Sequence, residues 1–174
     1  MTLDEFWNII DKAKNTTDPD EVVEIVTKEL ANLSDEEIVY YQKHFDTLFE
    51  RAEKWDLWGA IYLINGGCGD DSFMDFRYSL ISMGKEVYNN AIANPDSLAD
   101  LALNEDEDER FDALFNESFG YIAIEVYEEK TGEEIYDYRE DIDREEDMGE
   151  EWDFDDRDEC LKRLPRLTDK YWEE

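Results

Sequence analysis

The sequence predicts a mainly α-helical, single-domain protein: an antiparallel multi-helix bundle with an irregular acidic C-terminal arm. Apolar residues recur at spacings of three and four along most of the 174 residues, as they do on the buried face of a helix. Helix-capping residues precede several of these stretches, and short polar turns separate them, which favours antiparallel neighbours. We expect a helical core domain over 1–132, with the acidic arm and a short C-terminal helix of 133–174 docked on it.

The first part of the chain carries three helix-start signatures, at Thr2–Glu5, Asp18–Glu21 and Ser34–Glu37. In each, the first side chain can accept an amide three residues on, while the glutamate reaches back to the first amide. Pro19 also suits the first helical position. The predicted helices therefore run from Leu3 to Ala13, from Pro19 to Leu30 and from Asp35 to Ala52.

The middle of the chain is predicted as a buried helix, a hinge and further helices. The stretch Trp55–Ile64 is nearly all apolar, so this helix should be buried on most faces until Gly66 ends it. The next helix carries Phe73 to Ile81, capped by Asp71 or Ser72. Later boundaries follow from turn residues: Gly84 as a left-handed cap, Val87–Ile92 as a helix, Pro95–Asp100 as a short helix or turn, Glu105–Glu109 as a solvated loop or helix start, and Phe111–Tyr127 as a helix ending near Gly132.

The arm is the most acidic part of the chain. Residues 133–159 hold sixteen Asp or Glu against Arg139, Arg144 and Arg157, a net charge of −13 in 27 positions. The same segment contains Tyr136, Tyr138, Ile142, Trp152 and Phe154, which a freely moving tail has little reason to carry. We therefore expect the arm to dock on the helices, with a last short helix from Asp156 to Pro165.

The overall charge restricts the classes of partner. A formal net charge of −33 repels nucleic acids and anionic lipid, and it attracts a basic protein surface. No basic leader precedes an apolar stretch, and no segment approaches the roughly 18 apolar residues of a membrane span, so we expect a cytoplasmic protein. Cys68 and Cys160 lie 92 positions apart and His44 is the only histidine, which predicts reduced thiols and no zinc site or other cofactor.

The glycine-rich hinge Gly66–Asp71 is the first candidate site. Such hinges can present amides to phosphate, but Asp70 and Asp71 occupy the place of the anion, and the segment matches no nucleotide-binding pattern. Arg77 is expected to form an ion pair with these acids, with a carboxylate or phosphate ligand as the functional alternative. Cys68 as a nucleophile with His44 as its base is a weaker hypothesis than a buried packing cysteine, because nearby carboxylates disfavour the thiolate.

The stretch Trp152–Asp158 is the second candidate site. Asp153, Asp155 and Asp156 alternate in the manner of a calcium loop, but the central glycine and the glutamate at the twelfth position are missing. A weak divalent-cation site and a capped helix start on an acidic surface remain the two interpretations.

Several segments resemble the bacterial domain-of-unknown-function family 4240. They are 58–73, Phe76, 81–88 and 94–99, together with 1–7, 125–132 and 152–171, the last containing Leu164-Pro165-Arg166-Leu167. The resemblance implies a small helical bacterial protein whose relatives can occur beside WGR-type domains. It supplies no established activity and no catalytic residues.

The sequence favours a non-enzymatic, acidic protein-interaction module that binds a basic protein, as an inhibitor, an immunity protein or a regulatory subunit would. Mimicry of nucleic acid is a narrower version of this hypothesis. The alternatives are an enzyme with its site at the Gly66–Asp71 hinge and divalent-cation binding by the acidic arm. The candidate binding residues are Asp70, Asp71, Arg77, Trp152, Asp153, Asp155 and Asp156.

Overall fold

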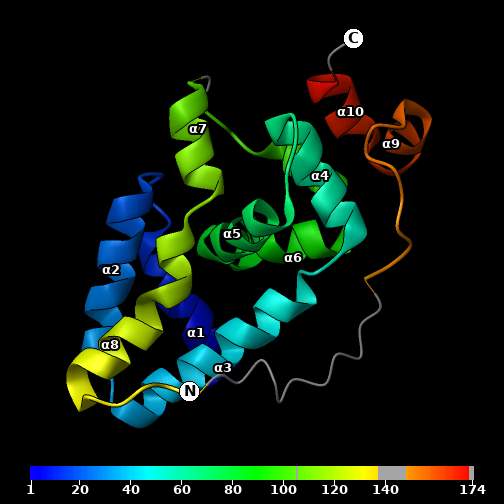
Figure 1. Ribbon diagram of the computed structural model, residues 1–174. Helices are drawn as coiled ribbons and strands as arrows, with labels where there is room; N and C mark the ends of the chain where they lie inside the picture. Colours follow the sequence, from blue (N-terminus) through cyan, green and yellow to red (C-terminus); the bar gives the residue numbers. More distant parts are fainter. Residues whose placement is uncertain (105, 137–147, 173–174) are drawn as a thin grey trace.

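A computed structural model describes residues 1–104, 106–136 and 148–172 (Figure 1). The described residues form a mainly α-helical single domain, as predicted. Residues 137–147, with Arg139, Tyr138, Ile142 and Arg144 of the predicted arm, lie outside the described residues. The helices are α1 (Leu3–Ile10), η1 (Asp11–Ala13), α2 (Pro19–Ala31), α3 (Asp35–Arg51), α4 (Trp55–Asn65), α5 (Asp70–Ser82), α6 (Lys85–Ala93), η2 (Pro95–Asp100), α7 (Glu107–Leu114), η3 (Glu117–Tyr121), α8 (Ile122–Thr131), α9 (Arg157–Arg163) and α10 (Pro165–Tyr171).

The first and third helices begin with the predicted capping boxes. At α1 the Glu5 amide donates to the Thr2 hydroxyl over 3.3 Å, and the Glu5 carboxylate accepts the Thr2 amide over 2.6 Å. At α3 Ser34 and Glu37 repeat the arrangement, with distances of 3.3 and 2.9 Å. Amides that would be unsatisfied at each helix start are therefore bonded by residues close in the sequence.

The second helix keeps its predicted cap but not its predicted box. The Asp18 carboxylate accepts the amides of Asp20 and Glu21, and Pro19 takes the first helical position. The Glu21 carboxylate accepts a hydrogen bond from the Thr16 hydroxyl instead of the Asp18 amide, and that amide donates to Thr16 as well. Thr16 lies two residues before the cap, and its hydroxyl bonds both the Glu21 carboxylate and the Asp18 amide. The predicted box at Asp18–Glu21 is therefore wrong.

The core is rich in aromatic side chains. Phe6 of α1 packs on Tyr41 of α3 with ring centroids 4.7 Å apart, and Tyr78 of α5 stacks on Phe49 of α3 at the same separation. The Tyr88 hydroxyl of α6 is buried and donates to the Leu48 carbonyl over 2.6 Å. Helices α2, α3 and α8 pack together on one side of the molecule, and α4, α5 and α6 lie beside them (Figure 1).

The boundaries of the middle helices differ from the prediction in two places. Gly66 ends α4 in a left-handed conformation, as expected, but α5 begins at Asp70 with Gly69 as its extended N-cap. Asp71 already lies in the first turn, so the prediction of Asp71 or Ser72 as the cap is wrong. Gly84 has a φ of 93°, but the C-cap of α5 is Met83 and Gly84 is the N-cap of α6, so the prediction of Gly84 as the cap that ends α5 is wrong. Gly66 and Gly84 both have positive φ values, which a residue with a side chain would adopt only with backbone strain.

The predicted helix from Phe111 to Tyr127 is interrupted. Asn116 breaks it into α7, η3 and α8, because its amide donates to the Ser79 hydroxyl over 2.7 Å and its side chain accepts the Phe119 amide. At the other end, Gly132 ends α8 in a left-handed conformation. The domain boundary that we place after residue 132 stays a prediction.

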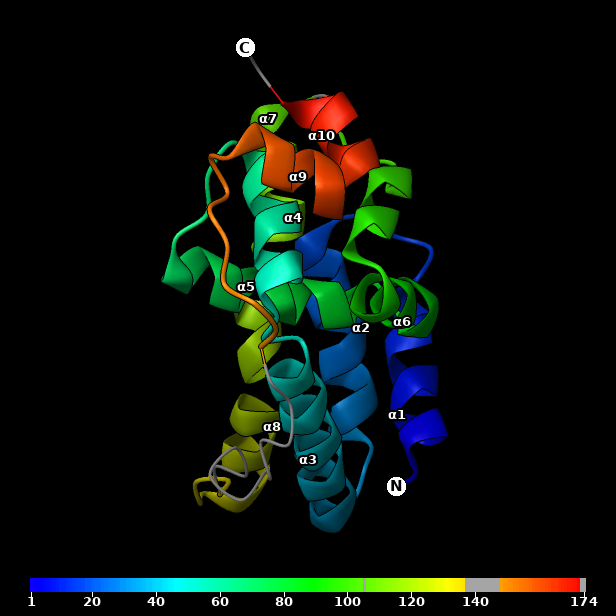
Figure 2. The same ribbon diagram turned by 90° about the vertical axis from the view of Figure 1, so that its right-hand side faces the viewer.

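The last two helices dock on the middle of the chain. Asp156 caps α9, as predicted, and α10 packs against η2, α4 and α9 (Figures 1 and 2). Helix α10 has no side-chain cap of its own. The buried Asp96 carboxylate accepts the amides of Arg166 and Leu167, over 3.2 and 3.0 Å. A residue of η2 therefore caps a helix about seventy positions later in the chain.

Candidate functional site

The hinge Gly66–Asp71 is fixed on α4 by side chains of that helix. The Trp58 indole donates to the Cys68 carbonyl over 2.9 Å, and the Asn65 side chain donates to the Gly67 carbonyl over 2.8 Å. The Trp58 ring also stacks on Phe73 of α5, with centroids 4.8 Å apart and planes 7° apart. The hinge is thus an ordered turn around Trp58, and it presents the exposed Asp70 and Asp71 at the start of α5.

Arg77 lies in the core beside α3. Its side chain is buried, its Nη1 donates to the Phe49 carbonyl over 3.3 Å, and its guanidinium lies 3.8 Å from the centre of the Phe49 ring. A guanidinium over an aromatic ring face is attracted by the ring quadrupole. Arg77 therefore holds α5 against α3, and its predicted ion pair with the hinge acids stays a prediction.

Cys68 is poorly suited to act as a nucleophile. Burial, together with the charge of Asp75, raises the pKa of the half-buried thiol to about 12. Little thiolate is present at neutral pH, and the thiolate is the reactive form. His44, the hypothetical base, has its Nε2 3.1 Å from the Met1 carbonyl and its ring beside Phe6.

The described part of the acidic arm lies along α4 (Figure 2). The Trp55 amide donates to the Met148 carbonyl over 2.9 Å, and the Trp152 indole donates to Asp56 over 2.9 Å. The Trp152 ring covers Gly59 so closely that a Cβ at that position would lie 2.3 Å from it. Glycine is therefore required at this point of α4, inside a helix where it is otherwise unfavourable.

The three candidate aspartates of the arm, Asp153, Asp155 and Asp156, are exposed, and their carboxylates accept hydrogen bonds from backbone amides or from a side-chain hydroxyl. Asp155 accepts a hydrogen bond from the Tyr62 hydroxyl over 2.8 Å, which raises the pKa of that tyrosine. Asp153 accepts the Asp155 amide, and Asp156 accepts the amides of the first turn of α9. The interpretation as a capped helix start is confirmed for Asp156.

An ion-pair network that the sequence analysis missed ties the arm to two helices. Arg163 of α9 is paired with Asp56 of α4 at 3.1 Å, with Glu150 of the arm at 2.6 Å and with Glu159 at 3.1 Å. Only 15% of the Arg163 side chain is exposed, and its guanidinium lies 5.4 Å from the centre of the Trp152 ring. The spacing of Glu159 and Arg163 was the one visible signal, because such i,i+4 pairs meet on a helix.

The hinge and the arm meet through the side chains of α4. The Trp58 ring contacts Phe73 beside the hinge and lies 6.1 Å from Phe154 of the arm. Phe154 also contacts Tyr62, whose carbonyl accepts the Gly67 amide and whose hydroxyl donates to Asp155. We call this the α4 frame: Trp58, Tyr62, Trp152 and Phe154, with the hinge on one side and the arm on the other.

In the part of the chain that the structure describes, no group of three or more His, Cys, Asp or Glu side chains gathers closely enough to hold a metal ion.

The comparison with protein families decides the classification. A family model described as "Protein of unknown function (DUF4240)" matches residues 1–129. The chain belongs to the DUF4240 family. The match covers the hinge and all of α4 of this DUF4240 protein, and the arm, α9 and α10 lie beyond it. Neither a curated protein nor a solved structure matches the chain.

Among the described residues of this DUF4240 protein, no helix combines the length and the apolar character needed to cross a bilayer.

Proposed function

We propose that this DUF4240 protein is a non-enzymatic, acidic interaction module that binds a basic protein partner, in the manner of an inhibitor, an immunity protein or a regulatory subunit. The observation that carries the proposal is the α4 frame, which holds the acids of the hinge and of the arm on one ordered support. The encounter is proposed to take place in the bacterial cytoplasm.

The carboxylates of the hinge and of the arm lie on an ordered support and are exposed to solvent. Asp70, Asp71, Asp153, Asp155 and Asp156 are all exposed, so a partner meets their charge before it contacts the protein. Such charges accelerate association and disfavour acidic competitors more than they add to affinity. A net charge of −33 extends the attraction beyond the contact itself.

The α4 frame and the neighbouring Trp55 also leave parts of their aromatic rings exposed. Trp55, Trp58, Trp152 and Phe154 are each only partly buried, and the first two rings are stacked with centroids 5.3 Å apart. Aromatic residues are enriched at protein interfaces because they give a large contact area at a small cost in conformational entropy. The surface therefore combines steering charge with apolar contacts.

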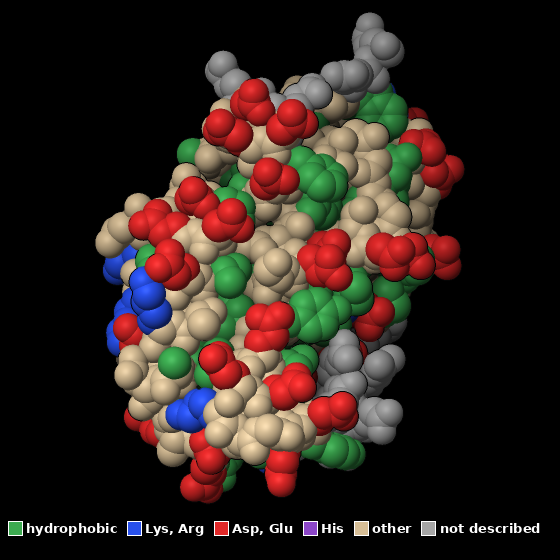
Figure 3. Space-filling view, turned by 60° about the vertical axis from the view of Figure 1, so that its left-hand side comes forward, with side chains coloured by type: hydrophobic (Ala, Val, Ile, Leu, Met, Phe, Trp, Pro, Cys, Tyr) green, Lys and Arg blue, Asp and Glu red, His purple; other side chains and the backbone are tan. Residues whose placement is uncertain are grey.

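Charge alone does not single out this surface. Figure 3, which views another side, shows Asp and Glu side chains spread among hydrophobic and neutral groups. The proposal therefore depends on the ordered aromatic support at the arm and hinge. Mimicry of nucleic acid toward a nucleic-acid-binding protein is a narrower version, motivated by the total charge.

The experiment compares two charge-reduced variants with the unmodified protein. The site variant carries Asp70→Asn, Asp71→Asn, Asp153→Asn and Asp156→Asn. The amide oxygens keep the acceptor roles of Asp153 and Asp156. The control variant removes the same charge from exposed positions elsewhere, through Asp20→Asn, Glu36→Gln, Glu86→Gln and Asp169→Asn.

A partner is recovered from the native host at low salt, and its association rate is then measured against ionic strength. We expect the rate for the unmodified protein to fall by about tenfold or more between low and high salt, since steering is screened. The site variant should lose most of this dependence and the control variant little of it. A rate that is insensitive to salt, or equal losses in the two variants, would contradict the proposal.

A further inference from the structure

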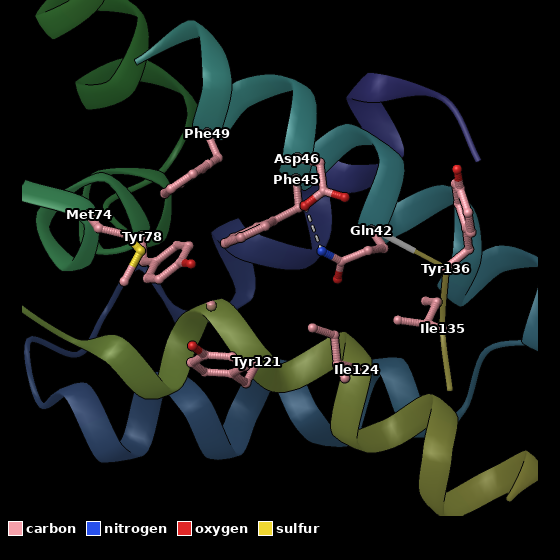
Figure 4. A pocket seen from close by; sticks show the side chains of 11 residues that line it. Gln42, Phe45, Asp46, Phe49, Met74, Tyr78, Tyr121, Ile124, Ile135 and Tyr136 are labelled. Carbon is pink, nitrogen blue, oxygen red and sulfur yellow. Dashed lines mark hydrogen bonds between the residues drawn. The ribbon is translucent and has the colours of Figure 1, made fainter. Parts of the chain in front are cut away.

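A cavity of about 140 Å³ lies between α3, α5 and the start of α8, away from the α4 frame (Figure 4). Ile135 and Tyr136, which follow α8, border it on another side. Tyr121 and Tyr136 are 39% and 53% exposed, so the cavity borders solvent where these residues lie. A cavity of roughly 150 Å³ can hold a benzene-sized molecule, so this cavity is large enough for a small ring compound.

The side-chain amide of Gln42 on α3 brings a hydrogen-bond acceptor to this cavity. Only 5% of Gln42 is exposed, and its amide nitrogen donates to the Asp46 carboxylate over 2.8 Å. This bond fixes the orientation of the amide, because an ionised carboxylate can only accept. The amide oxygen therefore points the other way, from α3 toward Ile124 of α8, and none of the described residues donates to it (Figure 4). Buried polar atoms are normally hydrogen-bonded, so this oxygen calls for a donor that enters the cavity.

The rest of the lining is aliphatic or consists of ring edges. The Phe45 ring stacks on Tyr41 and on Tyr78, with centroids 6.4 and 5.8 Å apart, and Tyr78 stacks on Phe49 at 4.7 Å. The faces of these rings are engaged within the core, so their edges are what they can offer to a ligand. Ring edges carry positive charge and prefer the face of another aromatic ring. The aliphatic side chains of the lining are Met74, Ile124 and Ile135.

We propose that this cavity binds a small neutral aromatic molecule with one hydrogen-bond donor, a compound of the phenol class, whose hydroxyl donates to the Gln42 amide oxygen. The acceptor is uncharged and the walls are apolar, which favours a neutral ligand, and the neighbouring Asp46 carboxylate repels an anion. Water alone would satisfy the oxygen but would leave the apolar walls without dispersion contacts. This site lies apart from the acidic surface, and the proposal does not depend on the proposed function.

The first test titrates the full-length protein with three probes and follows the side-chain amide of Gln42 and the methyl groups of Met74 and Ile124 by NMR. The probes are phenol, the nearly isosteric fluorobenzene, which has no donor, and the anion benzoate. We expect saturable binding of phenol, about fivefold tighter than that of fluorobenzene, as one net hydrogen bond provides, and no binding of benzoate. Absence of saturable phenol binding, or fluorobenzene binding as tight as that of phenol, would overturn the proposal.

A pair of matched variants locates the binding. Ile124→Phe fills the cavity from a partly exposed position, where the larger side chain is tolerated, and it should abolish the binding of both neutral probes. Ile92→Phe makes the same exchange at a partly exposed position of α6, which does not border the cavity, and it should leave phenol binding unchanged. Phenol binding that survives in Ile124→Phe, or that is lost equally in both variants, would contradict the location.

A third variant tests the hydrogen bond itself. Gln42→Met keeps the length of the side chain but removes the acceptor, so phenol should bind about fivefold more weakly, at the level of fluorobenzene, whose own affinity should not change. Circular dichroism checks the fold, because this variant also loses the bond to Asp46. A folded Gln42→Met protein that still prefers phenol to fluorobenzene would overturn the assignment of the donor site. If this variant does not fold, the probe comparison and Ile124→Phe still decide.

Discussion

The first helices of the chain and its last residues are held by contacts of very different range. Thr2 and Ser34 cap their helices through glutamates three positions away. In the C-terminal part, the cap of α10 comes from Asp96, the Tyr62–Asp155 bond spans 93 positions and the Arg163–Asp56 pair spans 107. The N-terminal helices can therefore begin to form from local signals, whereas the arm, α9 and α10 require an existing core to dock on.

The largest effect is expected when the contact between the arm and α4 is broken. Gly59→Ala places a Cβ within 2.3 Å of the Trp152 ring, so the arm must leave α4 or the helix must move. Overpacking of this kind typically costs about 1–3 kcal/mol, and we expect the upper end because Trp152 and Phe154 both meet the new atom. Urea unfolding measures the loss, and proteolysis within 148–156 reports the release of the arm.

The matched control for this substitution is Gly69→Ala, since no atom lies within 4 Å of the Cβ that it would add. By helix propensity alone, alanine inside α4 should stabilise the protein by about 0.5–1 kcal/mol. A Gly59→Ala variant as stable as the unmodified protein, or more stable, would show that the arm does not rest on α4.

A second substitution compares a remote cap with a local one. Asp96→Ala leaves two amides of α10 without their acceptor, and we expect a loss of about 2 kcal/mol, since Asp96 is buried. Ser34→Ala removes the local cap of α3 and should cost about 1 kcal/mol. Hydrogen exchange should locate the first loss in α10 alone, while the second lowers the stability of the whole domain. The opposite distribution would remove the distinction between the two regions.

A third substitution tests the ion-pair network. Arg163→Gln removes the pairs with Asp56, Glu150 and Glu159, and we expect a loss of about 1 kcal/mol because these carboxylates are partly or largely exposed. Lys162→Gln serves as the control, since Lys162 is 65% exposed and pairs only with Glu159 among the described contacts. Thermal unfolding at low and high salt measures both. Equal effects of the two substitutions would argue that the network contributes nothing to docking.

The smallest effect concerns pH and has opposite signs in different parts of the molecule. Hydrogen bonds from Thr2 lower the pKa of Glu5, and the bond and charge of Arg166 lower the pKa of Asp100, so both acids stabilise the fold above their unfolded pKa values. That stability is lost as pH falls through their lowered, folded-state pKa values. Asp75 of α5 differs, because burial and the charges of Glu117 and Asp71 raise its pKa.

For Asp75, the folded protein therefore disfavours the ionised form. Asp75→Asn should stabilise the protein slightly at pH 7, and the gain should disappear as pH falls below the ordinary pKa of 3.8, where the unmodified side chain is also neutral. Unfolding curves of the two proteins at several pH values test this. A gain that persists unchanged in acid would assign it to packing of the amide instead.

Features that depend on local contacts could be predicted from the sequence, and features that depend on remote contacts could not. The starts of α1, α2, α3 and α9 were predictable, because the side chain that caps each lies within three positions of the bonded amide. The break at Asn116 was not, because it depends on Ser79, which only the folded chain brings near. The cap of α10 by Asp96 was hidden for the same reason.

The sequence indicated the hinge and a docked arm, but not how the two are assembled on α4. The aromatic residues of the arm indicated docking, and the hinge was visible from its glycines. The role of Gly59 could not be predicted, since only the position of the Trp152 ring explains why a glycine lies within a buried helix. Arg163 was missed because two of its three carboxylate partners are distant in the sequence.

The most direct test of the central claim, that the acidic arm is held on α4, is the exchange rate of the Trp152 indole proton measured by NMR. This proton is bonded to Asp56, and the Trp58 indole, bonded to the Cys68 carbonyl, provides an internal reference beside the hinge. We predict that both indole protons exchange slowly in the unmodified protein and that Gly59→Ala releases the Trp152 proton. A Trp152 proton that exchanges as fast as that of free tryptophan would contradict the account.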